Sequence, residues 1–361
     1  MKKALIINPF GIGDVLFTTP LARALKENFG GISIGYWCNQ RVAPILEDNP
    51  HIDQLFRLSR GDLKKISRAS FWRGLKELLK LINSVRREHF DACFDFSLDH
   101  RYGLAAKIAG IRKRIGLNYK NRGRFLTDKI DISGYKGRHV VEFYLDLLKP
   151  LGITVRTRNP ELFVSAPEKN KALEILKKND ITAADLVIGI APGAGASWGR
   201  DSGRKQWRPD KFALLIDKLS QALNSKIILL GDITERPIAE KIISLVKTRP
   251  LDLVGRTTLK EFIAFLDVID ILVANDGGPL HMASALGKKT VSFFGPVDPE
   301  VYGPYPPDKQ RHLVLDKYLE CSPCYNDFRL MECRNHRDCL NLISVEEAFG
   351  AVEKLLPGEK R

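Results

Sequence analysis

Gly11-Ile12-Gly13-Asp14, which follows an apolar run at the start of the chain, could carry chemistry at a strand-to-helix turn. Glycines here would let a substrate hydroxyl approach the backbone closely, and the helix dipole would keep a carboxylate in the first helical turn ionised. Asp14 is therefore a candidate general base, and Gly13 beside it is a candidate acceptor-binding position. The alternative is that Asp14 only caps the helix. A dinucleotide fingerprint does not fit, because Leu16 stands where its third glycine belongs.

A second turn, Asn275-Asp276-Gly277-Gly278-Pro279-Leu280-His281, stands between a predicted strand and a predicted helix. Gly277 and Gly278 remove side chains where backbone amides could face a diphosphate. Asp276 could accept a hydrogen bond from a ribose or a base, and His281 could donate one to a phosphate. The pattern indicates a nucleotide cradle, and the alternative is an Asx turn followed by a histidine satisfied within the helix.

The segment 192–209 (PGAGASWGRDSGRKQWRP) combines small residues with cations. Its cations are Arg200, Arg204, Lys205 and Arg208. This composition suits a phosphate-binding loop, although a solvated loop is the alternative. The segment lacks the ending of an ATP-hydrolysing P-loop. Further along, Glu235 follows a predicted strand and could accept from a ribose.

Four of the six cysteines lie near the C-terminus, with spacing C-x2-C-x8-C-x5-C. They are Cys321, Cys324, Cys333 and Cys339. Four thiolates suffice for a tetrahedral zinc site, but the spacing does not repeat a paired C-x2-C knuckle. A buried or redox-labile thiol cluster is the alternative.

The chain of 361 residues has a formal net charge of +14, most of it in one segment. Residues 57–129 contain 19 Lys and Arg against 7 Asp and Glu. Such a field favours an anionic partner, whether nucleic acid, a membrane surface or a charged substrate. Nucleic acid is disfavoured, because the segment lacks interleaved aromatic residues and any nucleic-acid-binding motif. A solvated basic face without function is the alternative.

Alternating strands and helices must position these residues. Strands are predicted at 3–8, 32–38, 54–58 and 92–96, and then at 186–190, 226–230, 251–254, 271–274 and 290–294. Helices are predicted at 15–25 with a kink at Pro20, and at 42–47, 71–88, 103–109, 212–223, 237–246, 259–266, 280–286 and 345–355, the last behind a Ser344/Glu347 capping box. The two series predict two doubly wound α/β domains that join near residues 160–171. Ligands of such sheets bind at the carboxyl edges, so we expect a site between the domains.

The compartment follows from absences in the sequence. The N-terminal apolar run, residues 4–7, is too short for a signal peptide, and no stretch approaches the length of a spanning helix. Six cysteines in so long a chain do not make a secreted disulfide framework. We therefore expect a cytoplasmic protein, attached to membranes only peripherally.

Taken in order, four motifs resemble those of glycosyltransferase family 9, the heptosyltransferases. They are GxGD at 11–14, PGA…KxWxP at 192–209, DxGxxH at 276–281 and FFGPxDP at 293–299. The resemblance spans nearly the whole chain and implies the GT-B fold, in which two Rossmann-like domains face an interdomain cleft. We accordingly expect an acceptor-binding domain at 1–165, a nucleotide-sugar-binding domain at 166–340, and a C-terminal helix at 341–361 that returns toward the first domain.

The resemblance also implies roles for single residues. Asp14 matches the catalytic base, and Lys205 matches the lysine on the donor phosphate. The donor-binding residues that it implies are Ser197, Lys205, Glu235, Asp276, Gly277, Gly278 and His281. The acceptor-binding cations that it implies are Arg60, Lys64 and Arg122. Gly277 stands where the family usually has threonine, so one donor hydrogen bond is lost or comes from the backbone.

The implied activity is inverting transfer of heptose from ADP-heptose to the inner core of lipopolysaccharide, with an ADP-sugar as donor and no cofactor or metal. The implied acceptor is an anionic, lipid-linked core saccharide at the inner face of the inner membrane, and we expect a monomer. One alternative is a GT-B transferase that uses another nucleotide-sugar or another acceptor. The other is a non-catalytic basic module that docks on polyanions. Nucleotide preference distinguishes the first alternative. Absence of donor turnover, together with tight and salt-dependent binding of polyanions, would favour the second.

Overall fold

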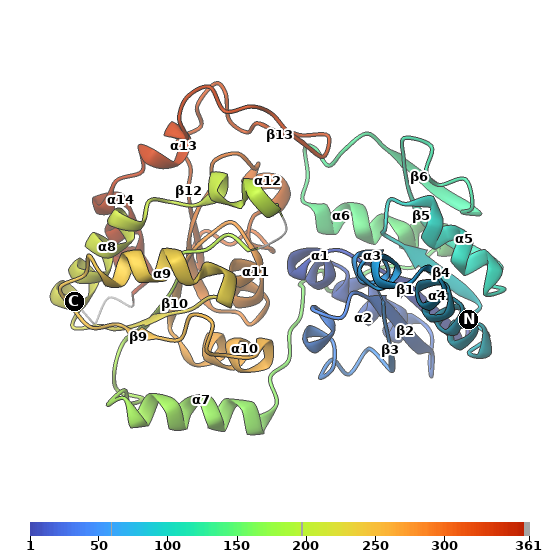
Figure 1. Ribbon diagram of the computed structural model, residues 1–361, viewed down its shortest axis with the longest axis horizontal. Helices are drawn as coiled ribbons and strands as arrows, with labels where there is room; N and C mark the ends of the chain where they lie inside the picture. Colours follow the sequence, from blue (N-terminus) through green and yellow to red (C-terminus); the bar gives the residue numbers. More distant parts are fainter. Residues whose placement is uncertain (59, 196–197, 357–361) are drawn as a thin grey trace. The chain divides into compact units, whose positions relative to one another are not determined.

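The protein forms two compact units, residues 1–162 and 163–361 (Figure 1). The structure is a computed structural model that describes residues 1–58, 60–195 and 198–356. Each unit contains a six-stranded parallel sheet flanked by helices, which confirms the prediction of two doubly wound α/β domains. No helix within these described ranges is long and apolar enough to cross a membrane.

The first unit has the strand order β3-β2-β1-β4-β5-β6. Its elements are β1 (Lys3–Ile7), α1 (Ile12–Phe17), α2 (Thr19–Asn28), β2 (Ser33–Cys38), η1 (Ala43–Ile45), β3 (Gln54–Arg57), α3 (Arg60–Ala69), α4 (Phe71–Arg87), β4 (Ala92–Asp95), α5 (His100–Ile108), β5 (Lys113–Tyr119), β6 (Asp128–Ile132), α6 (Val140–Leu145) and η2 (Asp146–Leu151). The strand order reverses direction between β1 and β4, and ligands of open parallel sheets bind beside such a switch point.

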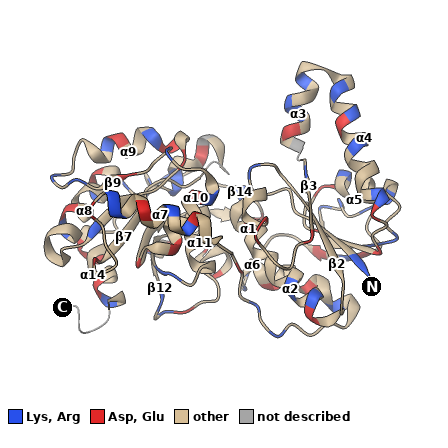
Figure 2. Ribbon diagram, turned by 90° about the horizontal axis from the view of Figure 1, so that it is seen from below, with Lys and Arg blue, Asp and Glu red and all other residues tan. Residues whose placement is uncertain are grey.

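Helices α4 and α5 cover one face of this sheet through a shared apolar cluster. Ile82 and Val85 of α4 pack there with Ala105 and Ala106 of α5 and with Leu5 of β1. Helices α1, α2 and α6 contact one another outside this cluster. Helix α3 and the first half of α4 form a hairpin that rises from the unit (Figure 2).

The predicted kinked helix at 15–25 is two helices. Thr18 separates them, and its hydroxyl is satisfied by the carbonyl of Val15 at 2.7 Å and by the hydroxyl of Tyr36 at 2.6 Å. Pro20 falls in the first turn of α2, where its missing N–H costs nothing. The helix predicted at 42–47 shrinks to the three-residue η1. Helix α3 and strands β5 and β6 were not predicted.

The second unit has the strand order β12-β11-β10-β7-β8-β9, with its switch point between β7 and β10. Its elements are α7 (Ala166–Lys178), β7 (Val187–Ala191), η3 (Gly199–Lys205), α8 (Pro209–Leu223), β8 (Lys226–Leu229), η4 (Ile233–Glu235), α9 (Arg236–Ile243), β9 (Leu251–Asp252), α10 (Leu259–Val268), β10 (Ile271–Asn275), α11 (Gly278–Ala285), β11 (Lys289–Phe293), α12 (Pro299–Tyr302), β12 (His312–Leu315), the hairpin β13 (Tyr325–Asn326) and β14 (Arg329–Leu330), α13 (Asp338–Asn341) and α14 (Val345–Leu355). The strands predicted from apolar runs all appear, within a few residues of their predicted ends.

The C-terminal helix α14 packs into the core of the second unit. Its Ser344/Glu347 capping box is confirmed, since both reciprocal hydrogen bonds form. Ala348 and Val352 then join the buried cluster formed by β7, β10, β11 and α8. The described part of the predicted third segment therefore belongs to the second unit, and its return toward the first unit stays a prediction.

Candidate functional site

Asp14 lies in the first turn of α1, directly after the loop that leaves β1 at the switch point of the first unit. The N-cap of α1 is Gly11, and no side chain makes a capping hydrogen bond. The alternative that Asp14 only caps the helix is therefore wrong. The Tyr144 hydroxyl on α6 donates to Asp14 Oδ1 at 3.1 Å, and Asn8 Nδ2 donates to the Asp14 carbonyl at 3.0 Å. These contacts fix the orientation of a half-buried carboxylate.

The acceptor-binding candidates follow strand ends on both sides of Asp14. Gly13 precedes it in α1, Arg122 follows β5, and Arg60 and Lys64 lie on α3, which follows β3. Four strand spacings separate β3 from β5, which is about 19 Å. Lys64 is exposed, whereas the side chain of Arg60 lies outside the described residues. The strand order therefore spreads these cations along one sheet edge, as an extended anionic acceptor would require.

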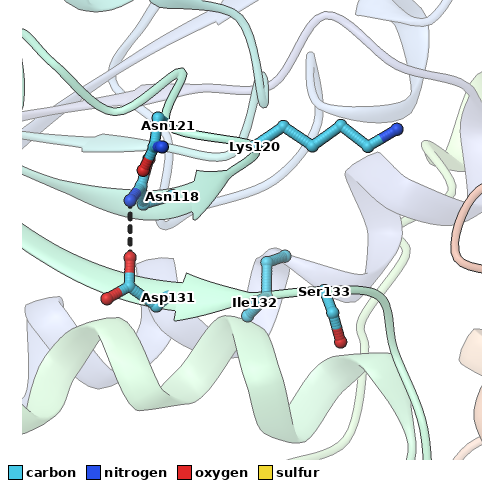
Figure 3. A pocket seen from close by; sticks show the side chains of 6 residues that line it. All are labelled: Asn118, Lys120, Asn121, Asp131, Ile132 and Ser133. Carbon is cyan, nitrogen blue, oxygen red and sulfur yellow. Dashed lines mark hydrogen bonds between the residues drawn. The ribbon is translucent and has the colours of Figure 1, made fainter.

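A polar pocket lies at the carboxyl ends of β5 and β6, close in sequence to Arg122 (Figure 3). It is lined by Asn118, Lys120, Asn121, Asp131, Ile132 and Ser133. Asn118 Nδ2 donates to Asp131 Oδ1 at 2.5 Å across the two strands. The cations of Lys120 and Arg122 lie 4.9 and 5.8 Å from the centre of the Tyr119 ring. The sequence analysis missed these lining residues because it did not predict β6.

Asp95 is a second carboxylate that the sequence analysis missed. It ends β4, the strand next to β1, and is buried. Burial raises the pKa of Asp95 to about 6, although hydrogen bonds from Ser97 lower it. Its signal in the sequence was a lone acidic residue inside an apolar strand.

In the second unit, three predicted donor-binding side chains meet at the switch point between β7 and β10. Lys205 Nζ lies 2.5 Å from Asp276 Oδ2, and His281 Nε2 lies 3.8 Å from Asp276 Oδ1. All three residues are buried. An amine, a carboxylate and an imidazole thus gather where the fold class places its ligands, although 71 residues of sequence separate Lys205 from Asp276.

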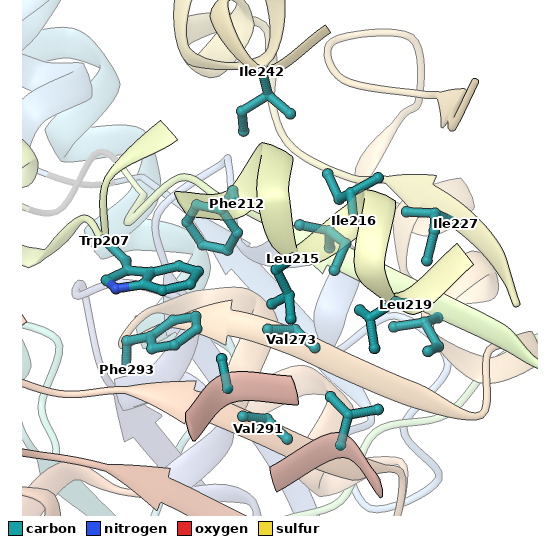
Figure 4. Close-up of a cluster of buried hydrophobic side chains, with 14 of the residues drawn as sticks. Trp207, Phe212, Leu215, Ile216, Leu219, Ile227, Ile242, Val273, Val291 and Phe293 are labelled. Carbon is teal, nitrogen blue, oxygen red and sulfur yellow. The ribbon is translucent and has the colours of Figure 1, made fainter. Parts of the chain in front are cut away.

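Lys205 is held in place by Trp207, the tryptophan two residues later. Trp207 is fully buried, and its ring stacks on Phe293 with centroids 4.3 Å apart (Figure 4). Its backbone N–H donates to Asn275 Oδ1 at 2.8 Å, and Asn275 Nδ2 donates to the Pro192 carbonyl at 2.7 Å. Asn275 therefore ties the loop that follows β7 and the segment around Lys205 to the end of β10.

The other cations of the 192–209 loop point elsewhere. Arg208 pairs with Asp210, and Arg204 donates to the Met331 carbonyl at 2.5 Å. Lys205 instead lies 4.6 Å from the centre of the Trp198 ring. Of the loop cations whose side chains the structure describes, Lys205 is the one that joins the buried cluster. Ser197 lies outside the described residues, as does the side chain of Arg200.

Glu235 reaches from the loop after β8 to the loop after β7. Its carboxylate accepts from Gly195 N at 3.1 Å and from Asp232 N at 3.0 Å. A Cβ at Gly193 would lie only 1.7 Å from Glu235 Oε1, so any side chain there would displace the carboxylate. Burial raises the pKa of Glu235, and the two backbone donors oppose that shift. Glu235 therefore joins two loops of the site, whatever else it binds.

Gly277 and Gly278 stand where α11 begins. Gly277 is the N-cap of α11, in an extended conformation that any residue could adopt. Its constraint is space, because a Cβ there would lie 3.3 Å from the Ala194 carbonyl oxygen. A threonine, usual in the family, would need the loop after β7 to shift. The backbone of Ala194, in the loop after β7, thus comes close to the Gly277-Gly278 turn, which was predicted to bind a diphosphate.

His281 is neutral at physiological pH. Burial lowers its pKa to about 4, and Lys205 acts in the same direction while Asp276 opposes both. A neutral imidazole still donates one N–H. His281 can therefore stabilise an anion as a hydrogen-bond donor but not as a cation.

The cysteine cluster forms no metal centre in this structure. Over the described ranges, no group of three or more His, Cys, Asp or Glu side chains is placed to hold a metal ion. Cys321 and Cys333 are exposed, and Cys324 and Cys339 are half-buried. Burial raises the pKa of Cys339 to about 11. These thiols are therefore not arranged as the zinc-site alternative requires.

Comparison with known proteins gives consistent matches. The profile described as Glycosyltransferase family 9 (heptosyltransferase) matches residues 78–334. Lipopolysaccharide heptosyltransferase 3 of Escherichia coli K12 is 26% identical over 358 residues, which cover 96% of this chain and 95% of that protein. Among solved structures, a family 9 glycosyltransferase from Veillonella parvula has a TM-score of 0.82 at 22% identity, covering 98% of this chain and 97% of that one. The E. coli ADP-heptose lipopolysaccharide heptosyltransferase II has a TM-score of 0.78 at 22% identity, covering 100% of each chain. The fold is therefore the two-domain GT-B architecture.

Proposed function

The chain belongs to glycosyltransferase family 9, the heptosyltransferases, and from that premise we propose that it transfers heptose from ADP-heptose to the lipopolysaccharide inner core. The observation that carries the proposal is the buried group of Lys205, Asp276 and His281 at the switch point of the second unit. A diphosphate needs a cation and hydrogen-bond donors, and a sugar or ribose needs an acceptor. This group offers all three.

The donor is proposed to be an ADP-sugar. Support comes from the relatives, which are named as heptosyltransferases, and from the solved structure named for ADP-heptose. Lys205 would contact the diphosphate, and Glu235 would accept from the adenosine ribose. The backbone of Gly277 and Gly278 would approach the phosphates. Ser197 remains a candidate in the same loop.

The reaction is proposed to be a direct displacement at the anomeric carbon. Asp14 would take the proton of the attacking acceptor hydroxyl. ADP would leave with its growing negative charge stabilised by Lys205, by the neutral N–H of His281 and by turn amides. One displacement inverts the anomeric centre. Because these protein groups supply the stabilising charge, we propose a metal-independent reaction without a cofactor.

The acceptor is proposed to be an anionic, lipid-linked core saccharide. Support comes from the basic segment 57–129 and from Arg122 and Lys64, which lie on the two sides of Asp14 along the sheet edge. Such an acceptor is confined to a bilayer. The protein would therefore work in the cytoplasm, peripherally at the inner face of the inner membrane.

The proposal is tested by calorimetric titration of the purified protein with ADP, UDP, GDP and NAD. We expect ADP to bind selectively and Asp276→Ala to weaken that binding at least about tenfold, because the site loses its buried acceptor for a ribose or base group. The matched control is Asp210→Ala, which removes the carboxylate of an exposed pair in the same unit. A preference for UDP or GDP would keep the fold and replace the heptose donor. Binding of none of the four would favour the non-catalytic polyanion-binding alternative.

A further inference from the structure

The hairpin formed by α3 and α4 is built to project. One residue, Ser70, joins the two helices, and its side chain accepts from Arg73 N at 3.4 Å to cap α4. A Cβ at Gly74 would lie 2.0 Å from Ser67 Oγ, so glycine lets the helices approach closely near their junction. The hairpin is thus a tight two-helix unit with its tip at Ser70 and Phe71.

Helix α4 is anchored in the core from Leu78 onward. Ile82 and Val85 are buried in the apolar cluster of the first unit. Phe71 lies 11 residues before Ile82, which is about 16 Å along a helix axis. The tip therefore stands clear of the core, and Figure 2 shows the hairpin rising above the sheet of the first unit.

Two large aromatic side chains are exposed at this tip. Phe71 is 67% exposed and Trp72 is 74% exposed. Their rings touch edge to face, with centroids 5.5 Å apart. Leu79, two turns along α4, is 49% exposed. Two exposed aromatic rings in contact with each other at a helix tip mark a site of interaction.

The surroundings of the tip are strongly basic. Residues 60–87 contain nine Lys and Arg against two Asp and Glu. Those with exposed side chains near the tip are Lys64, Lys65, Arg68, Arg73 and Lys76. Aromatic side chains surrounded by cations are suited to bind an anionic bilayer surface. There the aromatic rings insert at the level of the headgroups, and the cations pair with lipid phosphates.

We propose that the α3–α4 hairpin docks the enzyme on anionic phospholipid, with Phe71 and Trp72 inserted at the level of the headgroups. The inference deepens the membrane part of the proposed function and rests on it, because a lipid-linked acceptor gives the docking its purpose. It adds the element and the two residues that make the contact.

Vesicle flotation of the full chain tests the docking. We expect binding to vesicles of phosphatidylglycerol and phosphatidylethanolamine, weaker binding in high salt, and little binding to pure phosphatidylcholine. The double variant Phe71→Ala/Trp72→Ala should bind the anionic vesicles at least about tenfold more weakly. The matched control is Leu214→Ala, which removes another exposed apolar side chain, on α8 of the second unit. It should bind like the parent.

Fluorescence gives a second readout, because the chain has four tryptophans. Trp37 and Trp207 are buried, whereas Trp72 is 74% exposed. On binding, emission should shift to the blue and be quenched by brominated lipid, and both changes should vanish in Trp72→Phe. This variant keeps an aromatic ring at the tip and should retain vesicle binding.

Charge reversal separates the cationic contribution from the aromatic one. Arg68→Glu/Arg73→Glu should weaken binding to the anionic vesicles. Lys177→Glu/Lys178→Glu, an equal reversal on exposed α7, should not.

Three results would overturn the docking: no binding of the parent to anionic vesicles, undiminished binding of the double alanine variant, or tip-dependent self-association without lipid in sedimentation. ADP affinity and transfer to a delipidated core saccharide are measured in parallel, and the double alanine variant should keep both. If the parent binds vesicles through the tip but never binds ADP, the proposed function is wrong and the docking stands. If the parent transfers the sugar but the double alanine variant binds vesicles as well as the parent does, the docking is wrong and the proposed function stands.

Discussion

At the residue scale, the orientation of Asp14 depends on a tyrosine far away in sequence. The Tyr144 hydroxyl reaches Asp14 Oδ1 at 3.1 Å, and Tyr144 is almost completely buried. Its ring packs against Phe96, with centroids 4.7 Å apart. A rigid donor on Asp14 Oδ1 fixes the orientation of the carboxylate. Tyr144 is therefore a positioning residue for the proposed base.

Asp14→Asn should remove transfer and spare donor binding. An amide cannot take the proton, so we expect kcat to fall by roughly 10²–10⁴. ADP affinity should not change, because the proposed donor-binding residues belong to the second unit. Single-turnover transfer and ADP calorimetry check the two halves. The control is Asp48→Asn, an exposed carboxamide substitution in the same unit. Near-normal turnover of Asp14→Asn would rule out Asp14 as the base.

His281 should make the second unit sensitive to acid. Its pKa is about 4 in the folded state against 6.5 ordinarily, so between these values the unfolded chain binds a proton that the folded chain refuses. Titration of His281 therefore leaves the free energy of unfolding unaffected above pH 6.5 and decreases it as the pH falls toward 4. The decrease between pH 7 and pH 5 is about 2 kcal/mol. Urea unfolding followed by tryptophan fluorescence should show His281→Asn losing correspondingly less stability on acidification. His336→Asn, at an exposed position, should keep the parent slope, and an unchanged slope in His281→Asn would contradict the buried neutral imidazole.

The three residues of the proposed donor cluster, Lys205, Asp276 and His281, could be singled out from the sequence as candidates, but their mutual contacts could not be predicted. Asp276 and His281 share one motif, four intervening residues apart. The ion pair of Asp276 with Lys205 depends on the strand order, which places β10 beside β7. Tyr144 stands in no motif. Asn275 and Trp198 stand in two of the motif segments but were given no role, since each acts through a contact that only the fold creates.

At the element scale, the loop after β7 is fitted around the Glu235 carboxylate. Gly193 and Gly195 lie against that side chain. Asn275 holds the same loop from the other side through the Pro192 carbonyl. Side chains from two strand ends, Glu235 after β8 and Asn275 at the end of β10, thus hold the loop before any ligand binds. This lowers the conformational entropy that is lost on binding.

Gly193→Ala should disrupt this loop. A Cβ only 1.7 Å from Glu235 Oε1 must displace the carboxylate, so we expect ADP affinity to drop at least about tenfold while the unit remains folded. Gly203→Ala is the control, because the nearest atom to its added Cβ would be 3.9 Å away. Calorimetry and circular dichroism compare the two variants. Equal ADP affinity in both would show that the donor does not need this loop geometry.

The elements that the sequence predicted are the ones with continuous apolar runs. Strands β1, β7, β8 and β10 are almost completely buried, and their sequences show it directly. Strand β6 lies at the sheet edge, has no fully buried residue and contains three charged residues among five, so its sequence looks like a loop. Helix α3 was missed because Leu63 and Ile66 are its only large apolar residues. Edges and projecting elements depend on tertiary contacts rather than on a buried pattern.

At the scale of the whole molecule, both units place their candidate residues beside a switch point. Asp14 follows β1 in the first unit, and Asp276 follows β10 in the second. The sequence could predict this division because two series of strands and helices are visible in it. The proposed chemistry requires the two units to cooperate, since the base belongs to one and the donor cluster to the other.

ADP alone should therefore stabilise the two units unequally. At a concentration 100 times Kd, a ligand that binds only the folded form adds about 2.7 kcal/mol to stability. We expect this gain, measured as slower hydrogen exchange, in residues 163–356 and not in the core of residues 1–58 and 60–162. The Asp276→Ala variant should show no gain at the same ADP concentration. Protection centred on the first unit would contradict the proposed assignment of the donor to the second.

The pairing of Lys205 with Asp276 has a consequence for discrimination among the anions of a cell. The lysine is already neutralised by its partner at 2.5 Å, so a bare inorganic phosphate gains little from it and leaves a buried carboxylate facing a like charge. A nucleotide-sugar brings hydroxyl donors for Asp276 together with oxyanions for Lys205, and satisfies both at once. Inorganic phosphate and sulfate would therefore bind weakly, because they can satisfy Lys205 but not Asp276. The site would stay available for a nucleotide-sugar present at low concentration.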